Sequence, residues 1–164
     1  MHITDRLHRD IEGTCSGRYG YIISILNVKS ISHGTILDGL GYAEFTITFQ
    51  AIVFKPWKGQ VVDATVCTVN KMGFFAEVGP LTVFVSCHLL GADMQFEQGA
   101  GASGACYVAS GLGMGQGQGN AAQQRIAVGE QVRVRIIGTR VDATEIFAIG
   151  TVKEDYLGLI SAAV

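Results

Sequence analysis

The chain has 164 residues, of which 48% are hydrophobic and 16% are charged. This composition can fill the core of one domain or of two small ones, and it excludes a chain that is disordered throughout. Twelve Lys and Arg against fourteen Asp and Glu leave a formal net charge of -2, which excludes a protein that binds nucleic acids or membranes by bulk charge. Any affinity for RNA must therefore come from a local surface.

The sequence predicts neither a membrane span nor a secretory signal. The longest uncharged apolar stretch, residues 78–92, contains several polar side chains and is shorter than the ~20 apolar residues that a span needs. The N-terminus carries Asp5 and has no apolar core, unlike a signal peptide. The cysteines, at positions 15, 67, 87 and 106, form no Cys-x-x-Cys pair. We therefore expect free thiols in a reducing compartment, no metal site and no membrane partner.

The first part of the chain predicts one helix and two strands. Ile3, Leu7 and Ile11 recur at four-residue spacing, which predicts a short helix that ends before Gly13. Residues 19–28 are rich in Ile and Tyr, and residues 44–53 alternate apolar and polar side chains, so both segments predict strands. Residues 33–41 between them mix glycines with apolar side chains, although connections normally face water. These side chains either tuck into this domain or dock onto another molecule.

The second part of the chain predicts a small β-barrel. Pro56 and Gly59 mark the domain boundary, and the five segments that then read as short strands are residues 61–69, 74–78, 81–85, 131–137 and 145–152. Five short strands favour a closed Greek-key barrel, because a lone hairpin could not bury their apolar faces. Residues 99–119 hold eight glycines and no charge, which predicts a mobile loop.

None of the chemical motifs predicts an active site. Residues 99–104 match G-x-G-x-x-G, but the strand and helix that a dinucleotide site needs are missing, so the match is a coincidence of composition. Cys87 and His88 are neighbours and would point to opposite faces of an extended chain. The acids at positions 77, 93, 97, 142 and 145 form no pair. We expect no catalytic residue, no metal and no cofactor.

A local RNA-binding surface is the remaining candidate. Lys71, Phe74 and Phe75 stand at the turn between the first two barrel strands, and Arg133 and Arg135 share the polar face of the fourth. Exposed aromatic rings beside a basic groove are how small barrels hold single-stranded nucleic acid. The alternative is that a phenylalanine fills the core and that the arginines are ordinary surface charge.

Three separated blocks of sequence carry a resemblance to a known family. They are Glu-Gly-Thr-Cys-Ser-Gly-Arg-Tyr-Gly-Tyr at 12–21, Ala-Ile-Val-Phe-Lys-Pro-Trp-Lys-Gly at 51–59 with Val-Val-Asp at 61–63, and Phe-Ala-Ile-Gly-Thr-Val-Lys-Glu-Asp-Tyr-Leu-Gly at 147–158. In this order they resemble the larger stalk subunit of eukaryotic RNA polymerase II, the seventh subunit, which is related to a subunit of the archaeal polymerase. The resemblance is missing only from residues 99–119.

The resemblance implies a mainly β fold of two small domains. Residues 1–57 would form a truncated ribonucleoprotein-like α+β domain that docks on the polymerase, and residues 58–164 a five-stranded OB-fold barrel of the S-one type that binds RNA. The implied docking tip contains Gly34, Ile36, Leu37, Leu40 and Gly41, and the implied interdomain junction contains Phe54, Pro56 and Trp57.

The resemblance also implies a function. The chain would be a non-catalytic stalk subunit of DNA-directed RNA polymerase II in the nucleus. It would dock on the polymerase core near the clamp together with a smaller fourth-subunit partner, bind single-stranded nascent RNA and act in transcription initiation, without a cofactor. The alternatives are the stalk subunit of another nuclear polymerase, including the plant-type silencing polymerases, and a free single-stranded-RNA-binding OB-fold protein.

The sequence departs from the family pattern in two places. Family members usually have a further strand and the first helical turns before the position of Asp5, so we expect the N-terminal sheet to lack its first strand. In the barrel, Met72 and Ser86 stand where ribosomal-type barrels have an aromatic residue and a histidine, whereas Phe75 is retained. These departures predict a weaker RNA role than the fold alone would indicate.

Overall fold

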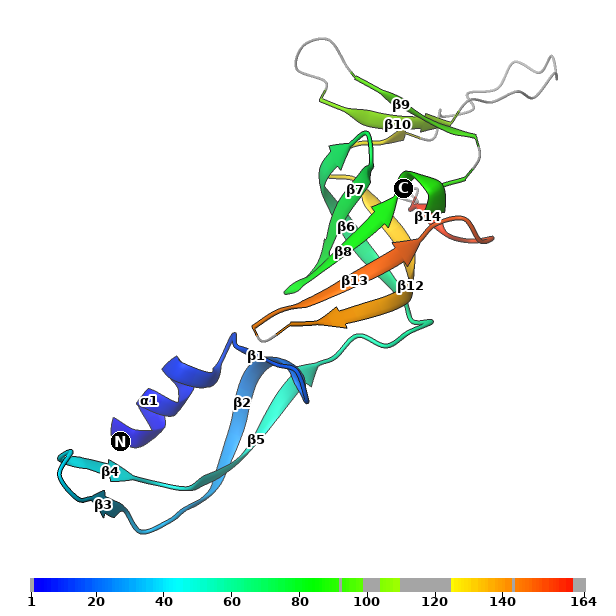
Figure 1. The fold of residues 1–164 in the computed structure, drawn as a ribbon. Helices are drawn as coiled ribbons and strands as arrows, with labels where there is room; N and C mark the ends of the chain where they lie inside the picture. The colour runs from blue at the N-terminus through cyan, green and yellow to red at the C-terminus, as the bar shows by residue number, and fades with distance from the viewer. Residues whose placement is uncertain (1, 92, 99–103, 110–124, 143, 161–164) are drawn as a thin grey trace, which may run out of the picture. The chain divides into compact units, whose positions relative to one another are not determined.

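The computed structural model describes residues 2–91, 93–98, 104–109, 125–142 and 144–160 (Figure 1). The chain forms two compact units, one made of Met1–Lys55 with Asp142–Glu145 and the other of Pro56–Val141 with Ile146–Val164. Within the described residues, no helix is both long enough and apolar enough to cross a membrane.

The first unit is a helix packed on a small antiparallel sheet. Its elements are α1 (His2–Ile11), β1 (Cys15–Ser16), β2 (Gly20–Ile31), β3 (Thr35–Leu37), β4 (Tyr42–Glu44) and β5 (Ile47–Phe54). The sheet has the order β1-β2-β5, and β3 pairs with β4 in a separate hairpin. The predicted helix and both predicted strands are therefore present, and the glycine-rich connection between the strands forms the β3–β4 hairpin.

The helix ends where its sequence predicts. Gly13 has a φ of 78°, a left-handed conformation that glycine adopts without steric cost. Its amide donates a hydrogen bond to the Ile22 carbonyl at 2.9 Å, which ties the end of the helix to β2. The preceding residue, Glu12, binds the same strand. One of its carboxylate oxygens accepts hydrogen bonds from the Ile25 amide at 2.8 Å and the Ser24 hydroxyl at 3.2 Å.

The second unit is a closed five-stranded barrel with further short elements. Its strands are β6 (Val61–Asn70), β7 (Gly73–Val78), β8 (Leu81–Ser86), β12 (Gln131–Val141) and β13 (Ile146–Thr151). They follow the order β13-β8-β7-β6-β12, and β12 also pairs with β13, which closes the barrel. A 3-10 turn, η1 (Cys87–Leu89), follows β8, and β14 (Gly158–Leu159) pairs with β12.

Alternating apolar residues fill the barrel. The fully or almost fully buried side chains include Ala64, Val66, Phe74, Ala76, Leu81, Val83, Val85, Val132, Val134, Ile136, Ile146 and Ala148. The barrel is tight at Gly150, where a Cβ would lie 2.2 Å from Val134 Cγ1. Only glycine fits here, because side chains of the neighbouring strands β12 and β8 occupy the space that a Cβ would take.

A small sheet that the sequence did not predict lies beside the barrel strands. It contains β9 (Met94–Glu97), β10 (Cys106–Ala109) and β11 (Arg125–Ile126), with β10 in the centre. The prediction of a mobile loop over residues 99–119 is therefore wrong for Cys106–Ala109. Tyr107 anchors this strand, because it is 2% exposed and its hydroxyl donates to the Asn70 carbonyl at 2.6 Å. Residues 99–103 and 110–119, and with them most of the G-x-G-x-x-G match, lie outside the described residues.

Candidate nucleic-acid interface

An apolar row crosses the outer face of three barrel strands. Phe75 on β7 pairs with Phe84 on β8, and Phe84 pairs in turn with Ile149 on β13. The two rings lie with centroids 4.8 Å apart and a 41° angle between their planes. Both rings are partly exposed, and Ile149 is exposed. Partly exposed aromatic rings on a barrel surface can stack on the bases of a single strand.

Of this row, only Phe75 was predicted from the sequence. Phe84 was missed, although the alternation in residues 81–85 contains the signal: Leu81, Val83 and Val85 are buried and Phe84 lies between them on the other face. Since successive side chains of a strand point to opposite faces, Phe84 and Phe75 both face outward. We call Phe75, Phe84 and Ile149 the aromatic row.

Phe74 does not belong to this surface. Its exposed fraction is 0%, so its ring fills the barrel core and cannot stack on a base in this structure. The sequence-based prediction put Phe74 and Phe75 together at the RNA surface, but adjacent residues of β7 must face opposite ways. We therefore remove Phe74 from the candidate site and keep Phe75.

The turn before β7 carries Lys71 and is held rigidly. Lys71 and Met72 are exposed between β6 and β7. Gly73 follows with a φ of 147°, and a Cβ at this position would lie 2.1 Å from the Val85 carbonyl oxygen. The Cys87 amide donates to the Met72 carbonyl at 2.9 Å. Lys71 thus stands at the end of the two strands that carry the phenylalanines of the aromatic row.

Arg133 and Arg135 are both engaged in ion pairs. Arg133 makes two hydrogen bonds to the Asp63 carboxylate on β6, at 2.7 and 3.0 Å, and Arg135 is paired with Glu154. The Arg133 guanidinium is also the main reason why the pKa of Asp63 lies below its ordinary value. Paired arginines have less charge to offer to a phosphate.

The two arginines stand on a different strand from the phenylalanines of the aromatic row. They lie on β12, which is separated from β7 by β6 and from β8 by β13, the strand that carries Ile149. Arg133 and Arg135 are therefore not on a strand adjacent to either phenylalanine. Lys71 and Phe75 stay together, and the arginines form a separate, charge-compensated region.

Possible metal ligands and reactive thiols among the described residues are the His, Cys, Asp and Glu side chains. No group of three or more His, Cys, Asp or Glu side chains lies close enough within them to hold a metal ion. Among the same residues, the four cysteines are free, and burial is the main cause that raises the pKa of Cys15 and of Cys67. A raised thiol pKa keeps these two side chains protonated and makes them poor nucleophiles.

The predicted docking tip is the β3–β4 hairpin. Ile36 on β3 is 75% exposed, and Leu37 and Leu40 are also exposed. Gly34 precedes β3 and Gly41 ends the turn between β3 and β4; both are exposed, and Gly41 has a φ of 67°. This hairpin presents large apolar side chains to solvent, which is typical of a surface that binds another protein.

The predicted junction residues differ in their surroundings. Phe54 is partly exposed at the end of β5, Pro56 is buried, and Trp57 is 66% exposed. The Trp57 amide donates to the Gln60 side-chain oxygen at 3.1 Å, and the Gln60 amide donates back to the Trp57 carbonyl at 3.2 Å. These bonds form a closed turn immediately before β6.

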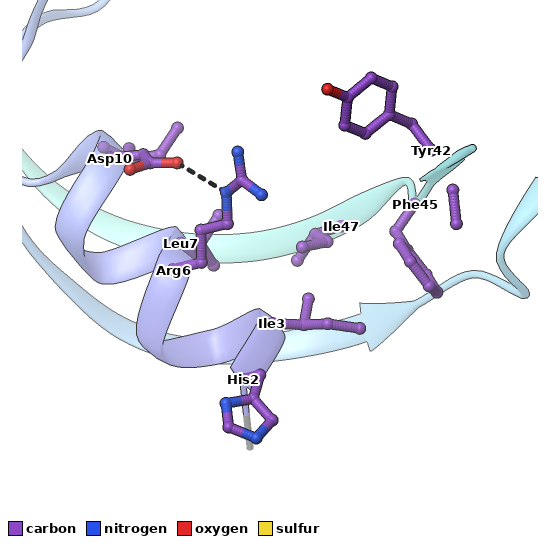
Figure 2. A pocket seen from close by; sticks show the side chains of 10 residues that line it. His2, Ile3, Arg6, Leu7, Asp10, Tyr42, Phe45 and Ile47 are labelled. Carbon is purple, nitrogen blue, oxygen red and sulfur yellow. Dashed lines mark hydrogen bonds and ion pairs between the residues drawn. The ribbon is translucent and has the colours of Figure 1, made fainter. Parts of the chain in front are cut away.

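The first unit also contains a groove of about 550 Å³ between α1 and the segment that runs from β4 into β5. Figure 2 shows that Ile3 and Leu7 of the helix lie along it with Ile47 of β5. Arg6 and Asp10 form an ion pair of 3.2 Å at its edge. The lining of the groove is mostly apolar, with charged side chains such as Arg6 and Asp10 among it.

Two family models match the chain. The model described as "SHS2 domain found in N terminus of Rpb7p/Rpc25p/MJ0397" matches residues 2–41, and the model described as "S1 RNA binding domain" matches residues 55–149. Together with the observed strands, these matches confirm the predicted fold class, a mainly β chain with a small α+β domain followed by a five-stranded barrel of the S1 type.

The chain is also similar to curated proteins over nearly its whole length. It is 47% identical to the RNA polymerase II subunit rpb7 of Schizosaccharomyces pombe over 97% of this chain and 86% of that protein. It is 43% identical to the RNA polymerase II subunit RPB7 of Glycine max over 98% of this chain and 84% of that protein. Its identity to the RNA polymerase IV subunit 7 of Arabidopsis thaliana is 26%, over 85% of this chain and 73% of that protein.

Proposed function

The chain belongs to the RPB7 family of RNA polymerase II subunits, and from this we propose that it is a non-catalytic stalk subunit of nuclear DNA-directed RNA polymerase II. In this proposal it docks on the polymerase core near the clamp together with a fourth-subunit partner, binds nascent RNA and acts in transcription initiation. The observation that carries the proposal is an identity of 43–47% that extends through both units.

The exposed apolar hairpin supports docking through the first unit. Ile36, Leu37 and Leu40 together expose apolar surface at the β3–β4 hairpin, and burying such side chains on a partner is worth about 1.5–3 kcal/mol for each one. An aspartate at these positions would instead bring an unpaired charge into the contact, which costs several kcal/mol.

Co-purification tests the docking. Tagged chain, recovered from a nuclear extract, should bring down the large polymerase subunits and a smaller partner, identified by mass spectrometry. The Ile36→Asp, Leu37→Asp double variant should lose them. The matched control is Thr48→Asp, Gln50→Asp, which places two aspartates at exposed positions of β5 in the same unit and should retain the polymerase.

The outcomes separate the possible readings. If the Ile36→Asp, Leu37→Asp variant recovers polymerase at wild-type yield, the assignment of the β3–β4 hairpin as the docking tip is wrong. Recovery of the large subunits of another nuclear polymerase would instead identify the chain as the stalk subunit of that enzyme. The observation that favours this alternative is the 26% identity to an RNA polymerase IV subunit. Recovery of no polymerase would reject the proposal and favour a free RNA-binding protein.

The match to an S1 RNA binding domain supports RNA binding by the second unit. The aromatic row supplies ring surface, and Lys71 supplies a charge at the end of the same strands. Base stacking tolerates different sequences because every base has a π-face. We therefore propose that the barrel holds nascent RNA with little sequence preference.

A further inference from the structure

A tight turn in the first unit exposes an aromatic ring beside an arginine that a lysine contacts. Residues 17–19 connect β1 to β2, and the Tyr19 amide donates to the Ser16 carbonyl at 3.2 Å. Gly20 follows with a φ of 92°, and a Cβ there would lie 2.4 Å from the Phe54 carbonyl oxygen. The turn is therefore held tightly against the end of β5.

Two interactions place positive charge at the turn. The Lys55 ammonium donates to the Arg18 carbonyl at 2.8 Å, and the Arg18 guanidinium carbon lies 5.3 Å from the centroid of the Tyr19 ring. That distance is within the range of a cation–π interaction. Tyr19 nevertheless remains 55% exposed, so much of its surface is still available to a ligand.

Arg18 and Lys55 differ from the barrel arginines in their ion pairing. In the part of the chain that the structure describes, neither residue takes part in a salt bridge, whereas Arg133 and Arg135 both do. An unpaired cation can bind a phosphate without first giving up a carboxylate. The turn therefore has cations that are unpaired, unlike Arg133 and Arg135.

From this geometry we propose that Arg18, Tyr19 and Lys55 form a second contact for single-stranded RNA, in which a base stacks on Tyr19 and a backbone phosphate binds Arg18 and Lys55. Ring surface beside unpaired cations is the chemistry with which proteins bind single strands of any sequence. An acidic protein surface would use the two charges and would have no need of the exposed ring. The inference rests on the proposed RNA-binding function.

The test is binding of a fluorescein-labelled 12-nucleotide oligouridylate to the full chain, measured by fluorescence anisotropy. Loss of one stacked aromatic costs about 5- to 150-fold in affinity, so Tyr19→Ala should weaken binding within that range while Tyr19→Phe, which keeps the ring, stays close to wild type. Lys55→Gln should weaken binding at low salt. Tyr156→Ala removes another exposed tyrosine, which belongs to the second unit and lies outside the aromatic row, and should have no effect.

A second measurement does not depend on any variant. Oligouridylate containing 4-thiouridine should cross-link to the wild-type tryptic peptide of residues 19–29. This peptide begins with Tyr19 because trypsin cleaves after Arg18 and after Lys29. Absence of this cross-link, or equal binding by Tyr19→Ala and Tyr156→Ala, would overturn the inference. If Tyr19→Ala or Lys55→Gln binds RNA as the wild type does and yet fails to co-purify with polymerase, that result would also overturn the inference, and it would show that the turn contacts a protein.

Failure of this site and failure of the proposed function give different results. If the barrel binds RNA and the turn does not, Phe84→Ala weakens binding and Tyr19→Ala does not, which rejects only the second contact. If wild-type chain neither binds the oligonucleotide nor co-purifies with polymerase, the proposed function and the inference both fall.

Discussion

Neighbouring phenylalanines of β7 serve the core and the surface respectively. Phe74 is fully buried in the barrel, and Phe75 packs on Phe84 at the outside. The pleat of the strand makes this division unavoidable, because consecutive side chains leave it on opposite sides. Stability and RNA binding can therefore be separated by substitutions one position apart.

We predict opposite profiles for the two alanine variants. Phe74→Ala should lower the free energy of unfolding by about 3–5 kcal/mol, since it removes a buried ring and leaves a cavity. Phe75→Ala should cost less stability and should weaken RNA binding by about 1–3 kcal/mol. Urea denaturation and anisotropy measure the two effects. A larger loss of stability for Phe75→Ala than for Phe74→Ala would contradict the assignment of the two faces.

The contact of the Glu12 carboxylate with β2 should depend on pH. The hydrogen bond from the Ile25 amide is the main cause that lowers the pKa of Glu12, and His8 and Ser24 act in the same direction. A carboxyl whose pKa is lower in the folded state stabilises the fold above its ordinary pKa and loses this contribution as the pH falls through the folded value.

The corresponding experiment compares thermal unfolding between about pH 6 and pH 3, a range that spans the ordinary glutamate pKa of about 4.3. Glu12→Gln, which cannot ionise, should lower the Tm at about pH 6 and flatten the fall of the Tm towards about pH 3. Glu44→Gln, at an exposed position of β4, serves as the control and should keep the wild-type profile. An unchanged slope for Glu12→Gln would show that the contact does not depend on charge.

At the scale of elements, the alternation of apolar residues predicted the barrel strands well. The segment 131–137 was expected and β12 contains it, because inward residues such as Val132, Val134 and Ile136 recur at every second position. The ends of strands were less predictable, since hydrogen bonds to neighbouring strands extend β12 as far as Val141.

Other features could not be predicted because they depend on distant partners. Arg133 is paired with Asp63, 70 positions earlier in the chain, and no local pattern announces such a pair. The strand Cys106–Ala109 lies among glycines that predict no order, and it forms by pairing with β9 and packing Tyr107 inside. At this strand the burial of the Tyr107 side chain outweighs the tendency of the glycine-rich composition towards an irregular loop.

Strand β10 should contribute measurably to stability through Tyr107. Tyr107→Phe removes the hydrogen bond to the Asn70 carbonyl and should cost about 0.5–1.5 kcal/mol. Tyr107→Ala removes the buried ring as well and should cost about 3–5 kcal/mol. Chemical denaturation measures both values. If the alanine variant is as stable as wild type, β10 does not pack on the barrel and residues 99–119 are dispensable as a whole.

At the scale of the whole molecule, RNA binding must work against a net charge of -2. Lys71, Arg18 and Lys55 are the cations that we propose as phosphate contacts. Two or three such contacts would give a slope of log affinity against log salt concentration of about -1.4 to -2.1. Lys71→Gln should reduce the magnitude of this slope by about 0.7. Arg133→Gln should leave it unchanged because Arg133 is already paired; the reverse result would place the RNA on β12.

The pairing of β10 with β11 has a practical consequence for the whole chain. Tyr107 pairs with Ile126 and Val108 with Arg125, so residues 110–124 begin and end at two adjacent strands. Lengthening a chain segment whose ends are already joined costs only about 0.6 kcal/mol for each doubling of its length. An affinity tag or a fluorescent reporter inserted between residues 110 and 124 should therefore leave the barrel intact, and evolution can vary the length of this segment at the same small cost.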